Sequence, residues 1–303
     1  MWRTTLARTP AYSGQVRWPR AGYEIASGGT ATSFAEFSGA MPRHYDECLG
    51  PVMFEPYAAD LARRVPRHGA TRVLELACGT GVVTRRLRAA LPESATLVAT
   101  DLSEEMVSYA REAVPLAGIA WCTADAQALP FADESFDVVV CQFGIMFLPE
   151  AARGFGEAHR VLAPGGTLLA NTWLGLDENP AHRAIHEACR EMFPDNPPRF
   201  LETPYGYHDP ERVRADAAAG GFAEVQLDTV RLHTRGPSAL EFARGMVRGT
   251  PLCRQLTERG ADLETATREV ARAVARVGGS APFTLDLAAT VVTAMRGARR
   301  ARS

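Results

Sequence analysis

The chain has 303 residues, a formal net charge of −2 and no lysine, so all 33 of its basic residues are arginines. This length predicts one large domain or two small ones, and a nearly neutral charge provides no general attraction for nucleic acid. The longest apolar run, residues 136–149, contains Gln142 and is too short for a membrane helix, so we expect no membrane insertion. The six cysteines form no C-x-x-C pair, which favours reduced thiols and a cytoplasmic location.

Residues 1–40 are predicted to be a disordered N-terminal extension. The first 23 residues carry four arginines and no acid, a composition that is typical of transit peptides. They lack the apolar face of a helix, which favours a disordered tail or a translation start at Met41 over a targeting segment. At the other end of the chain, residues 297–303 form a small basic tail.

Helical and strand-like patterns follow one another from residue 41 to residue 173. Residues 41–70 predict a helical preface, in which Pro56 lies near the start of the second helix. The following segments alternate between apolar runs and helical spacing, as in a parallel, doubly wound α/β sheet with right-handed crossovers. The expected strands are residues 71–77, 95–101, 118–125, 135–144 and 166–173, and the expected helices are residues 81–91, 103–114 and 151–162.

Beyond Trp173 the pattern changes to a helical insertion followed by a late pair of strands. Residues 174–222 combine two helices with a loop rich in proline and aromatic residues, which is typical of a lid over a substrate. Residues 223–296 combine late strands with further helices. We therefore expect one domain over residues 41–296, with residues 71–173 as its cofactor-binding core. The expected helices are residues 180–193, 210–221, 237–249 and 256–277, the loop is residues 193–210, and the strands are residues 222–233 and 283–294.

The turn after the first strand contains Gly79 and Gly81 but lacks the third glycine of a dinucleotide-binding turn, because Thr84 stands in its place. Glu75 precedes this turn, near the end of a strand that should be buried. A buried, unpaired carboxylate costs several kcal/mol, so Glu75 needs a partner, either an arginine of this chain such as Arg85 or a cationic ligand. A carboxylate beside the turn also repels a pyrophosphate, which favours a ligand with an amino-acid head.

Two further acids, Asp101 and Asp125, follow the second and third strands. Asp101 lies 20 residues after Gly81, where an acid accepts hydrogen bonds from ribose hydroxyls, although it could instead cap the helix that Ser103 begins. Asp125 can meet an adenine amino group, with the Ala126 N–H on a ring nitrogen, or it can serve only as a turn residue. Three acids at three successive strand ends lie where open α/β sheets bind their ligands.

Together these segments resemble the class I S-adenosylmethionine-dependent methyltransferases, and most of all the small-molecule enzymes of the ubiquinone/menaquinone-biosynthesis type. The resemblance covers about residues 41–173 and rests on VLELACGTGVVT, VATDLSEEMVSYA, TADAQALPF, FDVVVCQFGIMFL and RVLAPGGTLLANTW. It implies a Rossmann-like methyltransferase fold with a mostly parallel seven-stranded sheet, an antiparallel last strand, and S-adenosylmethionine as the cofactor.

The resemblance also implies which residues hold the cofactor. Glu75 would lie near the methionine ammonium, and Asp101 would take the ribose hydroxyls. An aromatic cover would favour the sulfonium by cation–π attraction, although helical aromatics are also ordinary core residues. The other implied contacts are Ala77, Gly79 and Gly81 at the turn, Leu102, Met106, Asp125 and Ala126 at the adenine, Cys141 and Gln142 beside the sulfonium and methionine carboxylate, and Tyr45 and Phe54 as a cover from the preface.

Methyl transfer requires a base only when the acceptor must lose a proton. His182 and His186 lie four residues apart on one helix, but they lack an HExxH motif and a carboxylate ligand, so we expect an exposed polar face and no metal. Candidate bases come instead from the preface and the late loop, where the titratable residues are His44, Tyr45, Tyr205, Tyr207 and His208, and we select His44, His208 and Tyr207 as catalytic candidates.

The fourth strand ends in CQFGIM, without the Asn/Asp-Pro-Pro-aromatic motif of enzymes that methylate adenine or amide nitrogens. We therefore expect a small-molecule methyl acceptor, such as a phenol, quinone, amine or natural-product intermediate, and no nucleic acid. Two alternatives stay open. One is a non-methylating enzyme or binding module with the same cofactor site, and the other is an NAD-dependent oxidoreductase, which Glu75 and the missing glycine oppose. The sequence predicts no particular oligomeric state.

Overall fold

The computed structural model describes residues 40–66 and 69–298. The expected N-terminal extension and its alternatives lie outside the described residues, apart from residue 40. Most of the expected basic tail also lies outside them.

A seven-stranded sheet runs through the described part of the chain, with the strand order β3-β2-β1-β4-β5-β7-β6. Strands β1 to β5 are parallel, and β7 runs antiparallel between β5 and β6. The order reverses between β1 and β4, and the carboxyl ends of strands beside such a switch point are where doubly wound sheets bind their ligands. The strands are β1 (Arg72–Leu76), β2 (Thr96–Asp101), β3 (Ile119–Thr123), β4 (Phe136–Gln142), β5 (Leu162–Trp173), β6 (Val225–Gly236) and β7 (Phe283–Met295).

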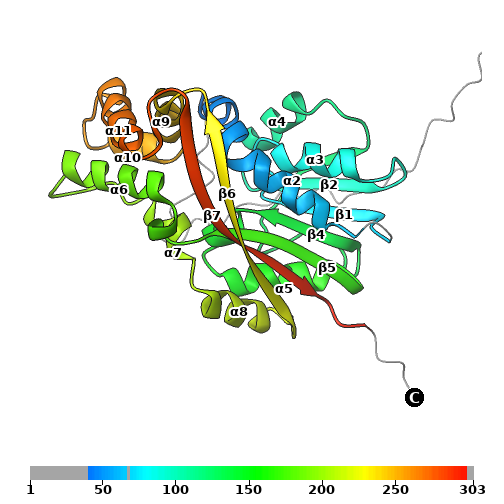
Figure 1. The fold of residues 1–303 in the computed structure, drawn as a ribbon. Coiled ribbons are helices and arrows are strands. Elements are labelled where there is room, and N and C mark those ends of the chain that lie inside the picture. Colours follow the sequence, from blue (N-terminus) through cyan, green and yellow to red (C-terminus); the bar gives the residue numbers. More distant parts are fainter. Residues whose placement is uncertain (1–39, 67–68, 299–303) are drawn as a thin grey trace, which may run out of the picture. The chain divides into compact units, whose positions relative to one another are not determined.

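Helices cover both faces of the sheet. Helices α2 and α3 pack together on one face, and α5 and α8 pack together on the other (Figure 1). Helices α6, α9, α10 and α11 form a group near the carboxyl ends of β5 and β6, which α6 and α9 follow in the chain. The helices are α1 (Met41–His44), the π-helix η1 (Tyr45–Phe54), α2 (Glu55–Arg64), α3 (Val82–Ala90), α4 (Glu104–Ala113), η2 (Ile145–Phe147), α5 (Ala151–Val161), η3 (Leu176–Glu178), α6 (Pro180–Met192), α7 (Glu202–Gly206), α8 (Pro210–Ala219), α9 (Ala239–Arg248), α10 (Leu252–Thr257) and α11 (Leu263–Gly278).

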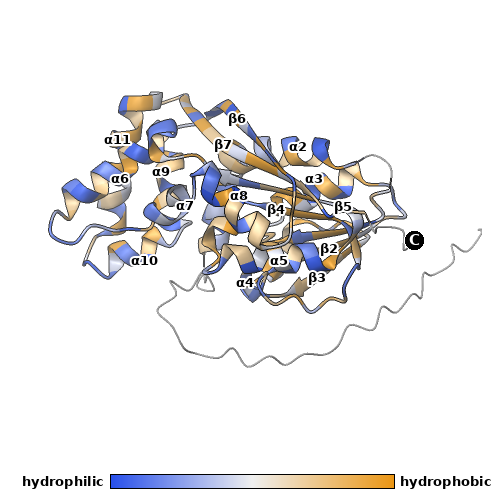
Figure 2. Ribbon diagram, turned by 90° about the horizontal axis from the view of Figure 1, so that it is seen from below, coloured by the Kyte–Doolittle hydropathy of each residue, from blue (hydrophilic) through white to orange (hydrophobic). Residues whose placement is uncertain are grey.

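The central strands are apolar on both of their faces. Val138, Val139 and Val140 of β4 are all buried, because helices cover the sheet from either side. Figure 2 shows the strands in the middle of the sheet mainly in the hydrophobic colour, whereas the surrounding helices carry both colours. The unbroken apolar run of β4 thus predicted its burial on both faces correctly.

The expected fold class is confirmed, and the antiparallel strand that the resemblance implied is β7. The local signals at two helix starts are confirmed as well. Ser103 caps α4, because its Oγ accepts a hydrogen bond from the Met106 N–H at 3.2 Å. Pro56 lies in the first turn of α2, as expected.

Three local features differ from the expected ones. The preface contains a π-helix, in which the Glu55 N–H bonds to the Gly50 carbonyl five residues earlier, and Pro51 in its middle has no N–H for an α-helical bond. The expected loop over residues 193–210 contains the short helix α7. The helical stretch over residues 256–277 breaks at Gly260, whose φ is +74°, before Asp262 caps α11.

Candidate functional site

The turn between β1 and α3 leaves open space at the carboxyl edge of the sheet. Gly79 and Gly81 have φ values of +53° and +84°, which favour glycine. A Cβ on Gly79 would meet no atom within 4 Å, whereas a Cβ on Gly81 would lie 2.9 Å from Cγ2 of Val114. Gly79 therefore leaves room for a ligand, while Gly81 serves the packing of the turn against the end of α4.

Glu75 is the buried carboxylate of this site. Its side chain is 1% exposed, and its Oε2 has no hydrogen-bond partner among residues 40–66 and 69–298. Burial raises the pKa of Glu75 to about 8, although the neighbouring Thr84 partly opposes this rise. Arg85, the partner that the sequence offered, instead lies 3.8 Å from Oε2 of Glu55. A buried acceptor of this kind requires a ligand that donates hydrogen bonds or carries positive charge.

Asp101 joins the glycine turn to the start of α4. Its Oδ2 accepts a hydrogen bond from the Gly79 N–H at 2.9 Å, and its Oδ1 accepts one from the Ser103 N–H at 2.9 Å. Burial raises the pKa of Asp101, and these N–H groups oppose the rise. The two roles that the sequence offered for Asp101 are therefore compatible, because the carboxylate supports the helix start while it lies at the edge of the turn.

The ends of β2 and β3 carry the residues that the resemblance assigns to an adenine. Leu102 is 43% exposed beside Asp101, whereas Met106 is 3% exposed and belongs to the packed face of α4. Oδ1 of Asp125 accepts a hydrogen bond from the Gln127 N–H at 2.8 Å, so Asp125 stabilises its own turn. Ala126 follows it and is half-buried. Leu102 thus offers exposed apolar surface here, and Met106 shapes the site from beneath.

The end of β4 contributes Cys141 and Gln142. Nε2 of Gln142 donates a hydrogen bond to the Phe54 carbonyl at 3.2 Å, while its Oε1 is buried without a partner in the described part of the chain. Burial raises the pKa of the Cys141 thiol to about 12, so this thiol is uncharged. The turns after β1 and β4 touch here, because a Cβ on Gly144 would lie 2.6 Å from the Cβ of Ala77.

Asp46 of η1 ties the preface to the glycine turn. Its Oδ1 accepts a hydrogen bond from Oγ1 of Thr80 at 2.9 Å, and its Oδ2 accepts one from the Tyr109 hydroxyl of α4 at 3.2 Å. Sequence reasoning did not select Asp46, because nothing local shows a bond to residues so far along the chain. The contact fixes the neighbouring Tyr45 over the edge of the sheet.

Tyr45 and Phe54 form the expected aromatic pair. Their rings stack with centroids 4.7 Å apart. Burial, and next the Asp101 carboxylate, raise the pKa of Tyr45. The edge of Phe54 also packs against Phe143, which follows β4. The pair therefore contributes to the core and borders the carboxyl edge at the same time.

A cavity of about 50 Å³, here called the aromatic pocket, lies beside this pair. Its walls come from η1, the turn after β4 with η2, the end of β5, the residues before and within α7, and the end of α9 with the residues after it. No charged side chain of the described residues lines it. Phe143 and Trp173 form part of its wall as a tight stack, with ring centroids 3.8 Å apart. Its aromatic residues are Tyr45, Phe54, Phe143, Phe147, Trp173, Phe200 and Tyr205.

The structure does not bring the three candidate bases to this pocket. The Tyr207 hydroxyl donates a hydrogen bond to Oδ2 of Asp216 on α8, at 2.6 Å. His208 is exposed, and its Nδ1 lies 2.8 Å from the Tyr205 carbonyl oxygen. His44 lies near α9, where burial and then Arg248 lower its pKa. In both segments a neighbouring tyrosine, not the selected candidate, lines the pocket.

His182 is not on an exposed face, and that expectation was wrong. The side chain is 0% exposed, and neither ring nitrogen has a hydrogen-bond partner within the described ranges. Burial lowers the pKa of His182 to about 3, so its imidazole is neutral. Its ring centroid lies 5.0 Å from that of Tyr205 and 6.2 Å from that of Trp173. The missed signal is the helical spacing of His182 with Ile185 and Cys189, which form a buried stripe of α6.

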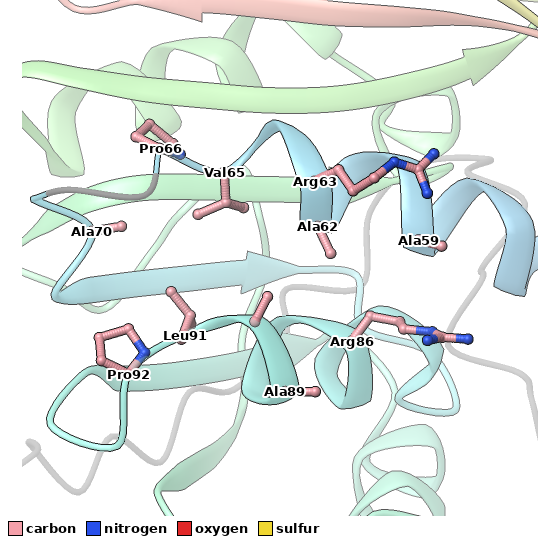
Figure 3. Close-up of a pocket in the computed structure, with 11 residues that line it drawn as sticks. Ala59, Ala62, Arg63, Val65, Pro66, Ala70, Arg86, Ala89, Leu91 and Pro92 are labelled. Atoms are coloured by element: carbon pink, nitrogen blue, oxygen red, sulfur yellow. The ribbon is translucent and has the colours of Figure 1, made fainter.

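A larger cavity, of about 580 Å³, lies between α2 and α3 (Figure 3). It reaches Ala70, which precedes β1, so it lies at the amino end of that strand and away from the carboxyl edge. Its two arginines, Arg63 and Arg86, pair with Asp60 and Glu55. This cavity therefore offers no unpaired charged group to a ligand.

Neither a metal-binding cluster nor a membrane span is found in the described part of the chain. Across residues 40–66 and 69–298, no group of three or more His, Cys, Asp or Glu side chains could hold a metal ion. Over the same ranges, every helix is too short or too polar to cross a bilayer.

Residues 74–170 match the family model of a methyltransferase domain. The chain is 39% identical over 102 residues to a malonyl-[acyl-carrier protein] O-methyltransferase of Hahella chejuensis, a match that covers 34% of this chain and 36% of that protein. It is 44% identical over 104 residues to a ubiquinone/menaquinone biosynthesis C-methyltransferase of Dinoroseobacter shibae, with 33% and 41% covered. The chain thus spans less than half the length of these curated relatives.

Among solved structures, a similar one is phosphoethanolamine N-methyltransferase 2 of Haemonchus contortus, solved in complex with S-adenosyl-L-methionine. It matches with a TM-score of 0.56 and 17% identity, covering 88% of this chain and 61% of that one. At such an identity the match supports the fold alone.

The sheet order, the glycine turn and the acids at the strand ends define a Rossmann-like methyltransferase fold. Residues 74–170 also match the model of a methyltransferase domain, in agreement with this fold. The resemblance that the sequence motifs showed is confirmed.

Proposed function

We propose that the protein transfers a methyl group from S-adenosylmethionine to a small-molecule acceptor. The observation that carries the proposal is the pair of acids at adjacent strand ends, the buried Glu75 and the partly exposed Asp101, neither of which has an arginine partner among the described residues. In its ionised form, either acid repels a diphosphate. The two acids favour a ligand that presents an ammonium group and ribose hydroxyls.

The polar atoms at the carboxyl edge fit this cofactor. The orphaned Oε2 of Glu75 can accept a hydrogen bond from the ammonium, and the partly exposed Asp101 can accept from the ribose. The orphaned Oε1 of Gln142 offers a second buried acceptor nearby. Gly79 leaves room above the turn, and the exposed face of Leu102 can cover the adenine. The Haemonchus enzyme that shares this fold binds the same cofactor.

The cofactor supplies a methyl group on a sulfonium, which is already a good leaving group, so the protein contributes mainly by orienting the acceptor. Tyr45 is central to this task, because it lines the aromatic pocket and is next to Asp46, which bonds to Thr80 of the glycine turn. Aromatic faces beside a sulfonium stabilise its charge by roughly 0.5–2 kcal/mol. Asp46 holds the helix that carries Tyr45 over the site, which excludes water from the reacting groups.

Calorimetry on cofactor-free protein tests the proposal. We expect S-adenosylmethionine to bind and NADH not to bind. The Glu75→Gln variant should bind the cofactor roughly 5- to 150-fold more weakly, which corresponds to the loss of a charged hydrogen-bond partner. Glu55→Gln is the matched control, because Glu55 pairs with Arg86 on the surface. Tight binding of NADH without a response to S-adenosylmethionine would contradict the proposal.

A role without methyl transfer makes a different prediction. None of the three selected bases lines the aromatic pocket, which leaves a non-methylating enzyme or binding module as the second candidate. Such a protein would bind S-adenosylmethionine through the same carboxylates, but it would form no S-adenosylhomocysteine. Incubation with a labelled methyl donor and a panel of phenols, quinones and amines separates the two functions.

A further inference from the structure

The walls of the aromatic pocket restrict the chemistry of the acceptor. Its lining is aromatic and aliphatic, and no Asp, Glu, Arg or His of the described residues contributes to it. An anionic acceptor would lose its hydration there without gaining a partner. The lining contains three residues with hydroxyl groups, Tyr45, Tyr205 and Thr250, of which Thr250 already donates its hydrogen bond to the Met246 carbonyl. A neutral acceptor with few polar atoms therefore fits this pocket best.

The hydroxyl of Tyr205 is a buried polar group without a hydrogen-bond partner in the described part of the chain. The side chain is 4% exposed and lines the pocket. Buried hydroxyls nearly always have a partner, so this one points to a missing ligand atom. The ring itself is firmly held, because it packs 6.0 Å from Trp173 and 5.0 Å from His182, measured between ring centroids.

The Tyr205 hydroxyl keeps its proton and lies toward the cofactor side of the pocket. Burial, and next the neighbouring Tyr57 and Tyr45, raise the pKa of Tyr205, so the phenol is a hydrogen-bond donor rather than a base. Tyr45 lines the same pocket, and the neighbouring Asp46 bonds to Thr80 of the glycine turn. An acceptor atom bound to the Tyr205 hydroxyl would therefore lie in the same part of the molecule as the carboxylates of the cofactor site.

We propose that the aromatic pocket receives the ring of a neutral aromatic acceptor and that the Tyr205 hydroxyl donates a hydrogen bond to a hydroxyl or carbonyl oxygen of that ring. This inference rests on the proposed methyl transfer. It narrows the acceptor from small molecules in general to phenols and quinones, and it excludes acceptors that carry a carboxylate group inside the pocket. Tyr205 then determines which edge of the ring faces the methyl donor.

The pocket must widen for such a ring to enter. Its volume of about 50 Å³ is well below the roughly 300 Å³ of a small ligand pocket. One wall is the segment before α7. The N–H groups of Arg199 and Phe200 both donate to Oε1 of Gln255, at 2.8 and 3.0 Å, and Arg259 donates to the Asn196 carbonyl at 2.6 Å. These bonds to α10 and the turn after it hold this wall in place, so entry of the ring by this side requires them to break.

Binding of three naphthalene probes tests the proposal without a methyl donor. The probes are 2-naphthol, naphthalene and 2-naphthoate, and their ring fluorescence reports binding to the wild type, to Tyr205→Phe and to Tyr57→Phe. We expect 2-naphthol to bind tighter than naphthalene, and 2-naphthoate to bind weakest. Tyr205→Phe should weaken 2-naphthol about five- to tenfold and leave naphthalene within about twofold. Tyr57→Phe is the matched control, because the Tyr57 hydroxyl donates to the Val230 carbonyl at 3.1 Å and does not line the pocket.

Two results would overturn the inference. One is unchanged 2-naphthol affinity in Tyr205→Phe, and the other is a wild type that binds 2-naphthoate as tightly as 2-naphthol. The ranking of the probes on the wild type needs no variant, so it holds even if Tyr205→Phe folds poorly. If the protein binds S-adenosylmethionine but fails the probe test, only this inference is wrong. If it binds the probes as expected but not S-adenosylmethionine, the proposed methyl transfer is wrong instead.

Discussion

At the scale of single residues, the Glu75 carboxyl is expected to lose a proton when the cofactor binds. Its pKa of about 8 keeps the carboxyl protonated at neutral pH in the ligand-free protein. An ammonium group beside it favours the carboxylate form. We therefore expect S-adenosylmethionine binding at pH 7 to release up to about one proton, and the affinity to rise with pH until Glu75 is ionised. Calorimetry in two buffers of different ionisation enthalpy measures this release.

Two variants show whether Glu75 is the source of the released proton. Glu75→Gln should abolish the proton release, since glutamine does not titrate, while Glu55→Gln should retain it. Wild-type binding with no buffer dependence would mean that the protonation state of Glu75 does not change when the ligand binds. The expected coupling between the raised pKa of Glu75 and ligand binding would then be wrong.

The sequence predicted the surroundings of some candidate residues and not of others, for clear physical reasons. Glu75 stood out because an acid at the end of an apolar strand conflicts with burial, and the structure does bury it. Tyr207 and Tyr205 looked alike in the sequence, because only the packed structure shows that one hydroxyl bonds to Asp216 and the other lines the pocket. His182 was misjudged because its spacing from His186 was weighed, but not its spacing from the apolar residues of the same helix.

At the scale of elements, the π-helix η1 is the proposed cover of the cofactor site. The sequence predicted a helical preface here, and the element exists. What the sequence could not show is how η1 is attached, because Asp46 bonds to Thr80 and Tyr109 only once β1, α3 and α4 have assembled. The bonds of Asp46 join η1 to residues far along the chain, so no local sequence pattern could predict them.

The hydrogen bonds of Asp46 to Thr80 and Tyr109 predict that Asp46 slows dissociation of the bound cofactor. Asp46→Ala removes two hydrogen bonds to a carboxylate, so we expect S-adenosylhomocysteine to dissociate roughly 5- to 150-fold faster, as measured by stopped-flow fluorescence. Asp46→Asn should restore part of the effect, because it keeps one carbonyl acceptor. Asp60→Ala in α2 is the control, since Asp60 pairs with Arg64 away from the turn. If Asp46→Ala lowers thermal stability without changing the dissociation rate, the contact is structural only.

At the scale of the whole molecule, the strands and the cofactor edge were more predictable than the acceptor pocket. Apolar runs and glycine turns act locally, and they fix the strands β1 to β5 and the acids that follow them. The aromatic pocket is built from residues as distant in the chain as Tyr45, Trp173 and Met246. Each of these is an ordinary apolar position within its own segment, so only the assembled chain shows that they surround one cavity.

The molecule's stability should respond to pH through two buried groups that act in opposite directions. The folded pKa of Glu75 is about 8 against an ordinary value of 4.5, so the unfolded chain loses its proton first and stability falls as pH rises from 4.5 through 8. The folded pKa of His182 is about 3 against 6.5, so the unfolded chain gains its proton first and stability falls as pH drops from 6.5 toward 3. Between 4.5 and 6.5 the two effects oppose each other.

We therefore expect the free energy of unfolding of the ligand-free protein to decline between pH 6.5 and 8, the window in which Glu75 acts without His182. Each group contributes at most about 1.4 kcal/mol per pH unit. Urea denaturation at a series of pH values measures the decline, which Glu75→Gln should remove and His182→Phe should leave intact. His182→Phe should instead reduce the loss of stability in acid. Identical slopes for the wild type and Glu75→Gln above pH 6.5 would show that the Glu75 carboxyl is not perturbed by burial, and the electrostatic basis of the cofactor site would then be lost.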